Sequence, residues 1–130
     1  MFKQTMLGLA ASCALALAGA GGALAAEPVK LGLIMPTKSL LGTQAVQAAN
    51  IAVEMIKEDG GILGGRDVEL IIYDDAFSPV EGVAAAQRLI DQDGVKFIVG
   101  QFSSTVALAM VPLAEAAEIL YVAAIPKHPD

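Results

Sequence analysis

The chain has 130 residues, enough for one modest domain, and its acidic balance limits the partners it can have. It carries 14 Asp and Glu against 8 Lys and Arg, a net charge of −6. Nucleic acid and anionic lipid surfaces both require clustered basic side chains, so we expect neither as a partner. Cys13 is the only cysteine, which excludes a disulfide within the chain.

The first 25 residues have the pattern of an export signal. Lys3 precedes a short apolar run rich in Ala and Leu, and Ala23-Leu24-Ala25 is the small-x-small pattern at which a signal peptidase cuts. We predict that residues 1–25 are a cleavable signal peptide and that residues 26–130 are delivered to the periplasm. Losing Lys3 would leave 7 basic against 14 acidic side chains, a net charge of −7.

Two other interpretations of this segment were weighed. A membrane-spanning helix is disfavoured, because the apolar run from about Met6 to Ala20 is short and no basic stop-transfer cluster follows it. In the second interpretation the chain is a lipoprotein, and Cys13, preceded by Leu9-Ala10-Ala11-Ser12, carries the lipid. The apolar segment before the cysteine would then be very short.

Strand-like and helix-like segments alternate after this leader. Short, nearly continuous apolar runs indicate strands at Val29–Met35, Val68–Tyr73, Val95–Val99 and Leu120–Ala124. Helical periodicity and capping residues indicate helices from Gly42 to about Asp59, from Pro79 to about Gln92, and from Ser103 or Ser104 to about Ala117.

The first two predicted helices have clear signals at their ends. Glycine tolerates left-handed backbone geometry, so Gly60-Gly61 should end the first helix. Ser78 is a good N-cap for the second, with Pro79 after it and Glu81 in the capping-box position. The side chains expected to face inward are Ala48, Ile51, Ala52, Met55 and Ile56 in the first helix, and Ala84, Ala85, Leu89 and Ile90 in the second.

This order predicts an α/β fold, an open parallel sheet flanked by helices on both faces and joined by right-handed crossovers. In such a sheet, ligands bind beyond the carboxyl ends of the strands. Four segments should lie at that edge: Pro36–Leu41, Asp74–Ser78, Gly100–Thr105 and Ala124–His128.

The motifs that enzymes place at this edge are missing from the sequence. No G-x-G-x-x-G follows the first strand, and there is no G-x-x-x-x-G-K-[ST] phosphate loop. Asp74-Asp75 lacks the further Asp that would end the third strand of a receiver domain, because Gly100-Gln101 stands there. His128, the only histidine, stands two residues before the last residue of the sequence and outside any G-x-S-x-G elbow. We therefore expect no catalysis, no cofactor and no metal site.

The stretch GQFSSTVALA, Gly100 to Ala109, places hydroxyl groups at the start of a helix. A helix N-terminus presents backbone N–H groups and favours negative charge, and hydroxyls add donors without adding charge. The cluster of Ser103, Ser104 and Thr105 is therefore suited to holding a carboxylate. The alternative is that a serine here is only the N-cap, and the spacing does not decide between them. Asp74-Asp75 is expected to order its own loop.

Five stretches together resemble a known family when taken in this order after a signal peptide. They are V-K-L-G-L-I-M-P-T, G-G-I-L-G-G-R-D-V-E-L, Y-D-D-A-F-S-P, D-G-V-K-F-I-V-G and S-S-T-V-A-L-A-M-V-P-L-A-E. They resemble the type I solute-binding proteins of branched-chain amino-acid and amide ABC transporters, the leucine/isoleucine/valine-binding family. The resemblance implies a periplasmic substrate-binding component that takes a small amino acid or amide and delivers it to a membrane permease. It also implies that residues 26–130 are the first of two lobes, incomplete and without the second.

The resemblance also implies roles for particular residues. Ser104 would hydrogen-bond the ligand carboxylate, and Ser103 and Thr105 would stand at the mouth of the cleft. Ile125 and Lys127 align with a small residue and a Ser or Thr that help hold the ligand in the family, so both depart from its pattern.

Two further points follow from the resemblance. Some members join the second and third loops by a disulfide, at positions that are Phe77 and Ser103 here. The alternative function is an extracellular ligand-binding sensory module of a receptor or regulator, because the same fold serves there.

Overall fold

The computed structural model describes residues 26–124. The predicted signal peptide, Cys13 and the candidate site residues Ile125 and Lys127 lie outside the described residues. The elements in chain order are β1 (Val29–Met35), α1 (Leu40–Glu58), β2 (Val68–Asp74), α2 (Pro79–Asp91), β3 (Phe97–Gly100), α3 (Ser104–Ala116) and β4 (Leu120–Ala123). No helix among the described residues is both long and apolar enough to cross a bilayer.

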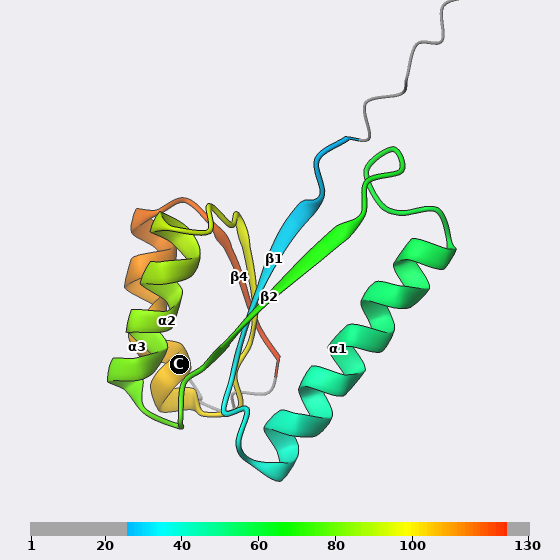
Figure 1. The fold of residues 1–130 in the computed structure, drawn as a ribbon. Helices are drawn as coiled ribbons and strands as arrows, with labels where there is room; N and C mark the ends of the chain where they lie inside the picture. The colour runs from blue at the N-terminus through cyan, green and yellow to red at the C-terminus, as the bar shows by residue number, and fades with distance from the viewer. Residues whose placement is uncertain (1–25, 125–130) are drawn as a thin grey trace, which may run out of the picture.

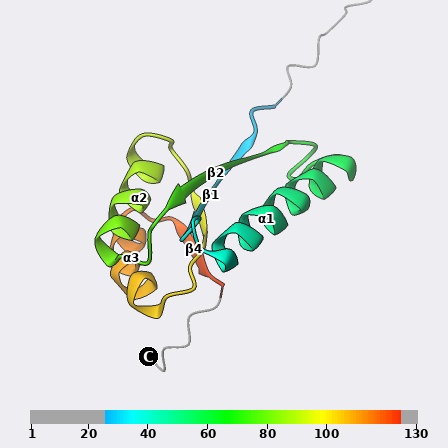
Figure 2. The same ribbon diagram turned by 60° about the horizontal axis from the view of Figure 1, so that its bottom comes forward.

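All four strands form one parallel sheet in the order β2-β1-β3-β4. Figures 1 and 2 show α1 on one side of this sheet and both α2 and α3 on the other. The step from β1 to β2 runs in one direction along the sheet, and the steps to β3 and β4 run in the other. Right-handed crossovers then place α1 opposite the other two helices. The predicted fold class and element order are confirmed.

Each helix begins at a serine whose side chain accepts a backbone N–H of the first turn. Ser39 accepts from Gly42 at 3.0 Å, Ser78 from Glu81 at 3.4 Å, and Ser103 from Val106 at 3.5 Å. The Ser78 cap was predicted, whereas the Ser39 cap was missed and α1 starts two residues earlier than expected. Its signal was present in the sequence, because Ser is a preferred N-cap.

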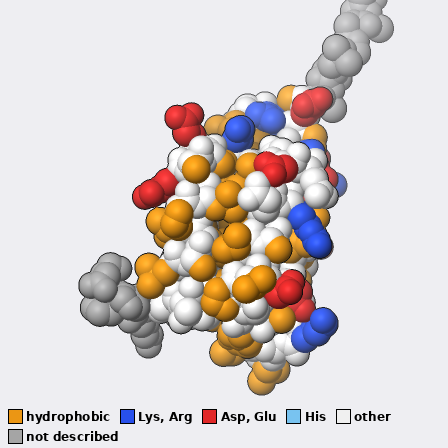
Figure 3. Space-filling model, turned by 90° about the vertical axis from the view of Figure 1, so that its left-hand side faces the viewer, with side chains coloured by type: hydrophobic (Ala, Val, Ile, Leu, Met, Phe, Trp, Pro, Cys, Tyr) orange, Lys and Arg blue, Asp and Glu red, His pale blue; other side chains and the backbone are white. Residues whose placement is uncertain are grey.

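The face covered by α2 and α3 holds the buried core. Glycine at position 32 of β1 makes room for Leu89, since a Cβ there would lie 2.6 Å from a Leu89 methyl carbon. Ile34, Leu89, Ile98, Val106 and Met110 are essentially inaccessible to solvent. Ala85, Leu89 and Ile90 face inward as predicted, whereas Ala84 is exposed. The outer surface of this layer, seen in Figure 3, mixes charged side chains with exposed apolar ones. Val80 of α2 and Leu108 of α3 are among the exposed apolar residues.

Within residues 26–124, the opposite face of the sheet is only half covered. Helix α1 packs on β2 and β1, and its sheet-facing side chains are Ala45, Val46, Ala49, Val53 and Ile56, all partly buried. The predicted inward face was therefore wrong except for Ile56, because Ala48, Ile51, Ala52 and Met55 are exposed. The helix is apolar over a wide arc, so its periodicity did not identify which part of the arc meets the sheet.

Candidate functional site at the carboxyl edge of the sheet

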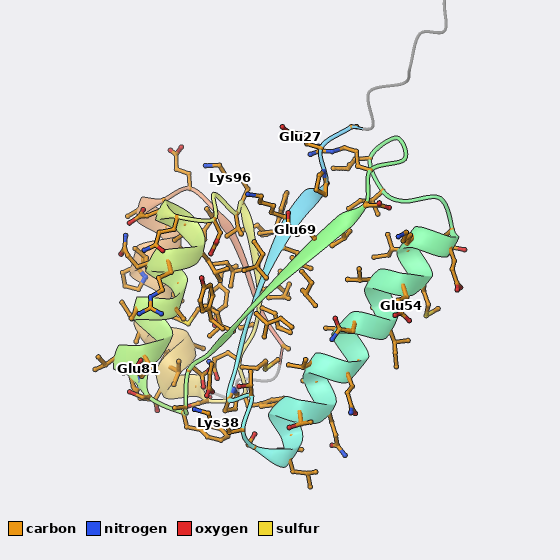
Figure 4. The ribbon with its side chains drawn as sticks, in the orientation of Figure 1. Glu27, Lys38, Glu54, Glu69, Glu81 and Lys96 are labelled. Carbon is orange, nitrogen blue, oxygen red and sulfur yellow. The ribbon has the colours of Figure 1, made fainter. Side chains whose placement is uncertain are left out.

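The carboxyl ends of the four strands lie level with one another, so the loops after them meet at one edge. Met35 of β1 pairs with Asp74 of β2, and Gly100 of β3 pairs with both Ile34 of β1 and Ala123 of β4. In Figure 4 this edge is marked by Lys38, while Glu27 and Lys96 lie at the opposite edge. The expected convergence of the first three loops is confirmed, and most of the fourth loop lies outside the described residues.

The three hydroxyl residues of the candidate site lie together at the start of α3. Ser103 is the N-cap, Ser104 is the first helical residue, and Thr105 follows with an exposed side chain. The Ser103 hydroxyl accepts the N–H of Val106. Ser103 therefore acts as the N-cap, which was the alternative to a ligand-binding role for a serine here. Ser104 and Thr105 are the two hydroxyl residues of the first helical turn itself, at the positive end of the helix dipole.

Gly100 and Gln101 turn the chain sharply between β3 and this helix. Gly100 has φ of +129°, and a Cβ there would lie 2.4 Å from the carbonyl oxygen of Ile34. Gln101 also has a positive φ, +90°, which is uncommon for a residue with a side chain. Backbone strain of this kind persists only where surrounding contacts hold it, and it is concentrated at functional sites.

Those contacts come from a buried polar clasp, formed by the side chains of Asp75 and Gln101. Both side chains are fully buried, and the Gln101 amide donates to the Asp75 carboxylate. The Gln101 carbonyl oxygen accepts the N–H groups of Phe102 at 2.8 Å and Ser103 at 3.0 Å. The Asp75 carboxylate accepts the N–H of Phe77 at 2.8 Å. The clasp thus fixes the loop after β2 to the loop that carries the hydroxyl cluster.

This clasp joins the same two loops that a disulfide joins in some members of the resembled family. The positions of that disulfide are Phe77 and Ser103, and each of them donates its backbone N–H to the clasp. The sequence shows that the cysteines are missing, but it does not show that a hydrogen bond between Gln101 and Asp75 joins the two loops instead. A buried Asp–Gln pair separated by 26 residues leaves no local pattern in the sequence.

Tyr121 lies against the clasp from β4. Burial, and then the negative charge of Asp75, raise the pKa of the Tyr121 phenol to about 12. Its hydroxyl is buried and has no hydrogen-bond partner among residues 26–124. The phenol therefore stays neutral at physiological pH.

Asp74 ties the first loop to the second at the same edge. Its carboxylate accepts the N–H of Thr37 at 3.0 Å and that of Ala76 at 3.1 Å, and it pairs with Lys38 at 3.2 Å. The Ala76 N–H, followed by Lys38 and the Thr37 N–H, holds the pKa of Asp74 below its usual value. The expectation that both aspartates order their loop is confirmed. A hollow of about 270 Å³ opens between these loops, lined by Pro36, Lys38, Ser39, Asp74, Ala76 and Phe77.

Replacing Asp74 with Asn is expected to lower stability at neutral pH by about 1 kcal/mol, because the hydrogen bonds lose their charged acceptor and the pair with Lys38 is removed. A carboxylate whose pKa falls on folding stabilises the fold above its unfolded pKa, near 3.8, and ceases to do so as pH drops through the lower folded value. The difference between wild type and variant should therefore shrink below about pH 3.8 in urea unfolding. Asp67→Asn, at an exposed carboxylate, is the control; a difference that persists unchanged at low pH would contradict this role for Asp74.

The groups at this edge are suited to binding a small molecule reversibly. Among residues 26–124 no group of three or more His, Cys, Asp or Glu side chains is placed to hold a metal ion. A larger hollow of about 380 Å³ lies under the open half of the sheet, but its lining is wholly apolar and has no group to orient a polar ligand. The hydroxyls and helix N-terminus at the carboxyl edge are instead suited to a small anion.

An open parallel sheet with a hydroxyl-lined helix N-terminus at its carboxyl edge is the architecture of a small-molecule-binding α/β domain. A protein-family model described as "Periplasmic binding protein" matches residues 28–129. The chain belongs to the periplasmic binding protein family.

Curated relatives agree with this assignment. The chain is 36% identical over 110 residues to the Leu/Ile/Val-binding protein BraC3 of Rhizobium johnstonii, covering 82% of this chain and 29% of that protein. It is 38% identical over 96 residues to the leucine-, isoleucine-, valine-, threonine-, and alanine-binding protein of Pseudomonas aeruginosa, covering 71% of this chain and 25% of that one. The chain thus spans between a quarter and a third of these relatives' lengths.

Solved structures match the same region. An ABC transporter substrate-binding protein of Desulfitobacterium hafniense in complex with Leu has a TM-score of 0.71 at 27% identity, over 80% of this chain and 30% of that one. A solute-binding protein of Rhodopseudomonas palustris in complex with 3,4-dihydroxybenzoic acid has a TM-score of 0.65 at 32% identity, over 76% of this chain and 27% of that one. These neighbours are solute-binding proteins of transporters.

Proposed function

We propose that this chain is the first lobe, here incomplete, of the substrate-binding component of an ABC transporter, and that it binds a small amino acid or amide for uptake. The observation that carries the proposal is the hydroxyl cluster at the start of α3, held at the carboxyl edge by the Asp75–Gln101 clasp. Two curated relatives are named for binding leucine, isoleucine and valine, and these names support an amino acid as the ligand.

The ligands named for the two solved neighbours share one chemical group. Leucine and 3,4-dihydroxybenzoic acid differ in size, shape and amine, but both carry a carboxylate. The N-terminus of α3 is suited to that group, because hydroxyl and N–H donors hold an anion without a countercharge. We therefore propose that this lobe binds the carboxylate, and that residues outside this site contact the rest of the ligand.

Ser104 is the residue we propose to hydrogen-bond the carboxylate, with Thr105 beside it. Ser103 contributes by capping α3, and so by fixing where the helix begins. Ile125 and Lys127 follow β4 in the sequence, lie outside the described residues, and remain proposed contacts. No cofactor or metal is proposed.

The proposed cellular setting follows from the predicted export signal and from the family. Residues 1–25 would direct the chain to the periplasm and be removed, leaving residues 26–130 as the lobe, and the lipid-bearing role of Cys13 is the less favoured alternative. The partner would be the membrane permease of the transporter. The names of the relatives and neighbours favour transport over the sensory alternative.

The carboxylate preference is tested by ligand-dependent thermal unfolding. L-leucine and 3,4-dihydroxybenzoate, the second supplied as its salt, are added in excess to the purified chain, with L-leucinol as the matched compound that has no carboxylate. A ligand that binds only the folded state raises the unfolding temperature with concentration. We expect an increase for at least one of the two acids and none for leucinol. An equal increase for leucine and leucinol, or none for any of the three, would refute the proposal.

Replacing Ser104 with Ala is expected to weaken binding of the responding acid by about 10- to 150-fold, because one charge-assisted hydrogen bond worth about 1.5–3 kcal/mol is lost. The measurement is a calorimetric or NMR titration at matched protein concentration. Ser78→Ala, which removes an N-cap at the same edge but on α2, is the control and should leave affinity within about twofold of wild type. Unchanged affinity in Ser104→Ala would remove Ser104 from the site.

A further inference from the structure

We propose that the ring of Phe77, in the loop after β2, forms an apolar wall of the ligand site and selects ligands by the apolar group that they carry beyond the carboxylate. This inference rests on the proposed function, because it adds a specificity-determining residue beside the hydroxyl cluster. Three observations on Phe77 support it: its backbone conformation, its half-exposed ring and its place next to the start of α3.

The backbone of Phe77 has a conformation that residues with large side chains rarely adopt. Its φ is +58° and that of Ala76 is +47°, so two consecutive residues other than glycine are left-handed. Glycine and asparagine are the residues that tolerate this region, and a bulky side chain there is a clear outlier. Strain of this kind persists only where surrounding contacts impose it, and it is concentrated at functional sites.

Hydrogen bonds to two aspartates impose this conformation. The N–H of Ala76 donates to the Asp74 carboxylate at 3.1 Å, and the N–H of Phe77 donates to the buried Asp75 carboxylate at 2.8 Å. The N–H of Ser78 donates to the carbonyl oxygen of Asp75 at 2.7 Å. All three donors are backbone groups, so none of these contacts needs an aromatic side chain at position 77. They fix the point from which the ring projects.

The ring does not fill the core. Phe77 is 50% exposed, and it lines the hollow of about 270 Å³ at the carboxyl edge together with Pro36 and Lys38. Lys38 marks this edge in Figure 4. Aromatic side chains supply a large apolar area, and small-molecule sites are lined mainly by apolar and aromatic groups with a few polar ones among them. A strained loop that displays such a ring beside a hollow has the features of a binding wall.

Phe77 lies next to the proposed carboxylate site. The Asp75–Gln101 clasp accepts the N–H of Phe77 through its carboxylate and the N–H of Ser103 through its amide oxygen, at 2.8 and 3.0 Å. The first turns of α2 and α3 are also in close contact, since a Cβ at Gly82 would lie 2.4 Å from a methyl carbon of Val106. A ligand whose carboxylate is held at the start of α3 would therefore place its remaining atoms beside the ring.

This placement predicts that acids with a large apolar group bind more tightly than small acids. Contact with the ring removes apolar ligand surface from water, which favours binding in proportion to the area buried, and a small acid has little such surface. The preference should depend on the Phe77 ring, whereas the carboxylate contact should not.

An NMR titration with two pairs of acids tests the preference. L-leucine is paired with L-alanine, and 3,4-dihydroxybenzoate with acetate, so the members of each pair share a carboxylate and differ in their apolar group. For the acid that binds, we expect a lower Kd than for its small partner in the wild type, and a Kd at least about fivefold higher in Phe77→Asn. The Kd of the small partner should stay within about twofold of wild type.

Thermal unfolding separates this role from a structural one. Asparagine tolerates the left-handed region, so Phe77→Asn should unfold at the same temperature as wild type or higher, whereas loss of a structural ring would lower that temperature. Leu63→Asn is the matched control, because Leu63 is 71% exposed, has φ of +48° and lies in the turn before β2 at the amino edge. Its unfolding temperature should respond in the same direction, and every Kd should stay within about twofold of wild type.

Four results would overturn the proposal. An unchanged Kd for the larger acid in Phe77→Asn, or an equal loss in Leu63→Asn, would remove Phe77 from the site but leave the carboxylate site in place if Ser104→Ala still weakens binding. Protection of the Phe77 ring from hydroxyl-radical oxidation in a longer, ligand-free protein containing this region would assign the ring to further polypeptide. No response to any of the four acids would refute both this inference and the proposed function.

Discussion

Replacing Gln101 with Ala is expected to lower the free energy of unfolding by about 3 kcal/mol or more. The substitution removes the amide that donates to the buried Asp75 carboxylate and the oxygen that accepts two backbone N–H groups. A buried charge that loses its partner is among the most costly single changes in a folded protein. Chemical denaturation monitored by circular dichroism measures the loss.

The chain contains a matched control for this prediction. Gln87 and Asp91 form the same kind of amide–carboxylate pair, at 2.5 Å, on the exposed surface of α2. Gln87→Ala should cost less than about 0.5 kcal/mol, because water replaces the lost partner. Gln101→Gly should cost less than Gln101→Ala, since glycine relieves the positive φ while losing the same hydrogen bonds. Equal losses for Gln101→Ala and Gln87→Ala would show that the clasp does not hold the two loops.

Replacing Gly100 with Ala is expected to destabilise the fold by at least about 3 kcal/mol, because the new Cβ meets backbone and the backbone angle is unfavourable. A Cβ at Gly100 would lie 2.4 Å from the Ile34 carbonyl oxygen, and relieving that contact requires β1 and β3 to separate. The loop that carries Ser103 and Ser104 begins one residue later. Ligand binding should therefore be lost together with stability, as followed by thermal unfolding with and without ligand.

Gly94→Ala separates the two causes of this effect. Gly94 has a positive φ of +70° but nothing within 4 Å of its ideal Cβ, so alanine there is expected to cost only about 1–2 kcal/mol. The difference between their losses in free energy of unfolding measures what the close approach of β3 to β1 contributes. Equal losses in the two variants would show that this close approach does not contribute to stability.

The sequence was sufficient to predict the architecture, because apolar runs, capping serines and turn glycines are local signals. The β1 bounds, the Ser78 cap and the turn at Gly60-Gly61 were all predicted correctly. The inward face of α1 was not, because its apolar arc is wider than the sheet it meets.

The site was predicted only in part. Ser103, Ser104 and Thr105 are candidates because a helix start rich in hydroxyls is a pattern in consecutive residues, and the structure places them at the start of α3. The clasp was missed because Asp75 and Gln101 are brought together by the parallel register of β1 with β2 and β3, which sequence spacing does not encode. Tyr121 was assigned only to a strand, and its position beside Asp75 depends on the same register.

The proposed function assigns different tasks to these residues. The clasp and Gly100 fix the position of the α3 N-terminus, and the hydroxyls of the first turn are the proposed donors to the ligand. A rigid site needs no reorganisation when the ligand arrives, so less binding free energy is spent on ordering it. The proposed carboxylate grip thus depends on residues that never touch the ligand.

An NMR titration of the uniformly ¹⁵N-labelled chain with L-leucine tests the central claim most directly, because it reports the binding position residue by residue. The predicted result is a saturable shift of amide signals at the start of α3, from Ser103 to Ala107, with smaller shifts in the loops after β1 and β2. Shifts centred on the apolar hollow beneath β3 and β4, or an unchanged spectrum at millimolar leucine and at millimolar 3,4-dihydroxybenzoate, would contradict it.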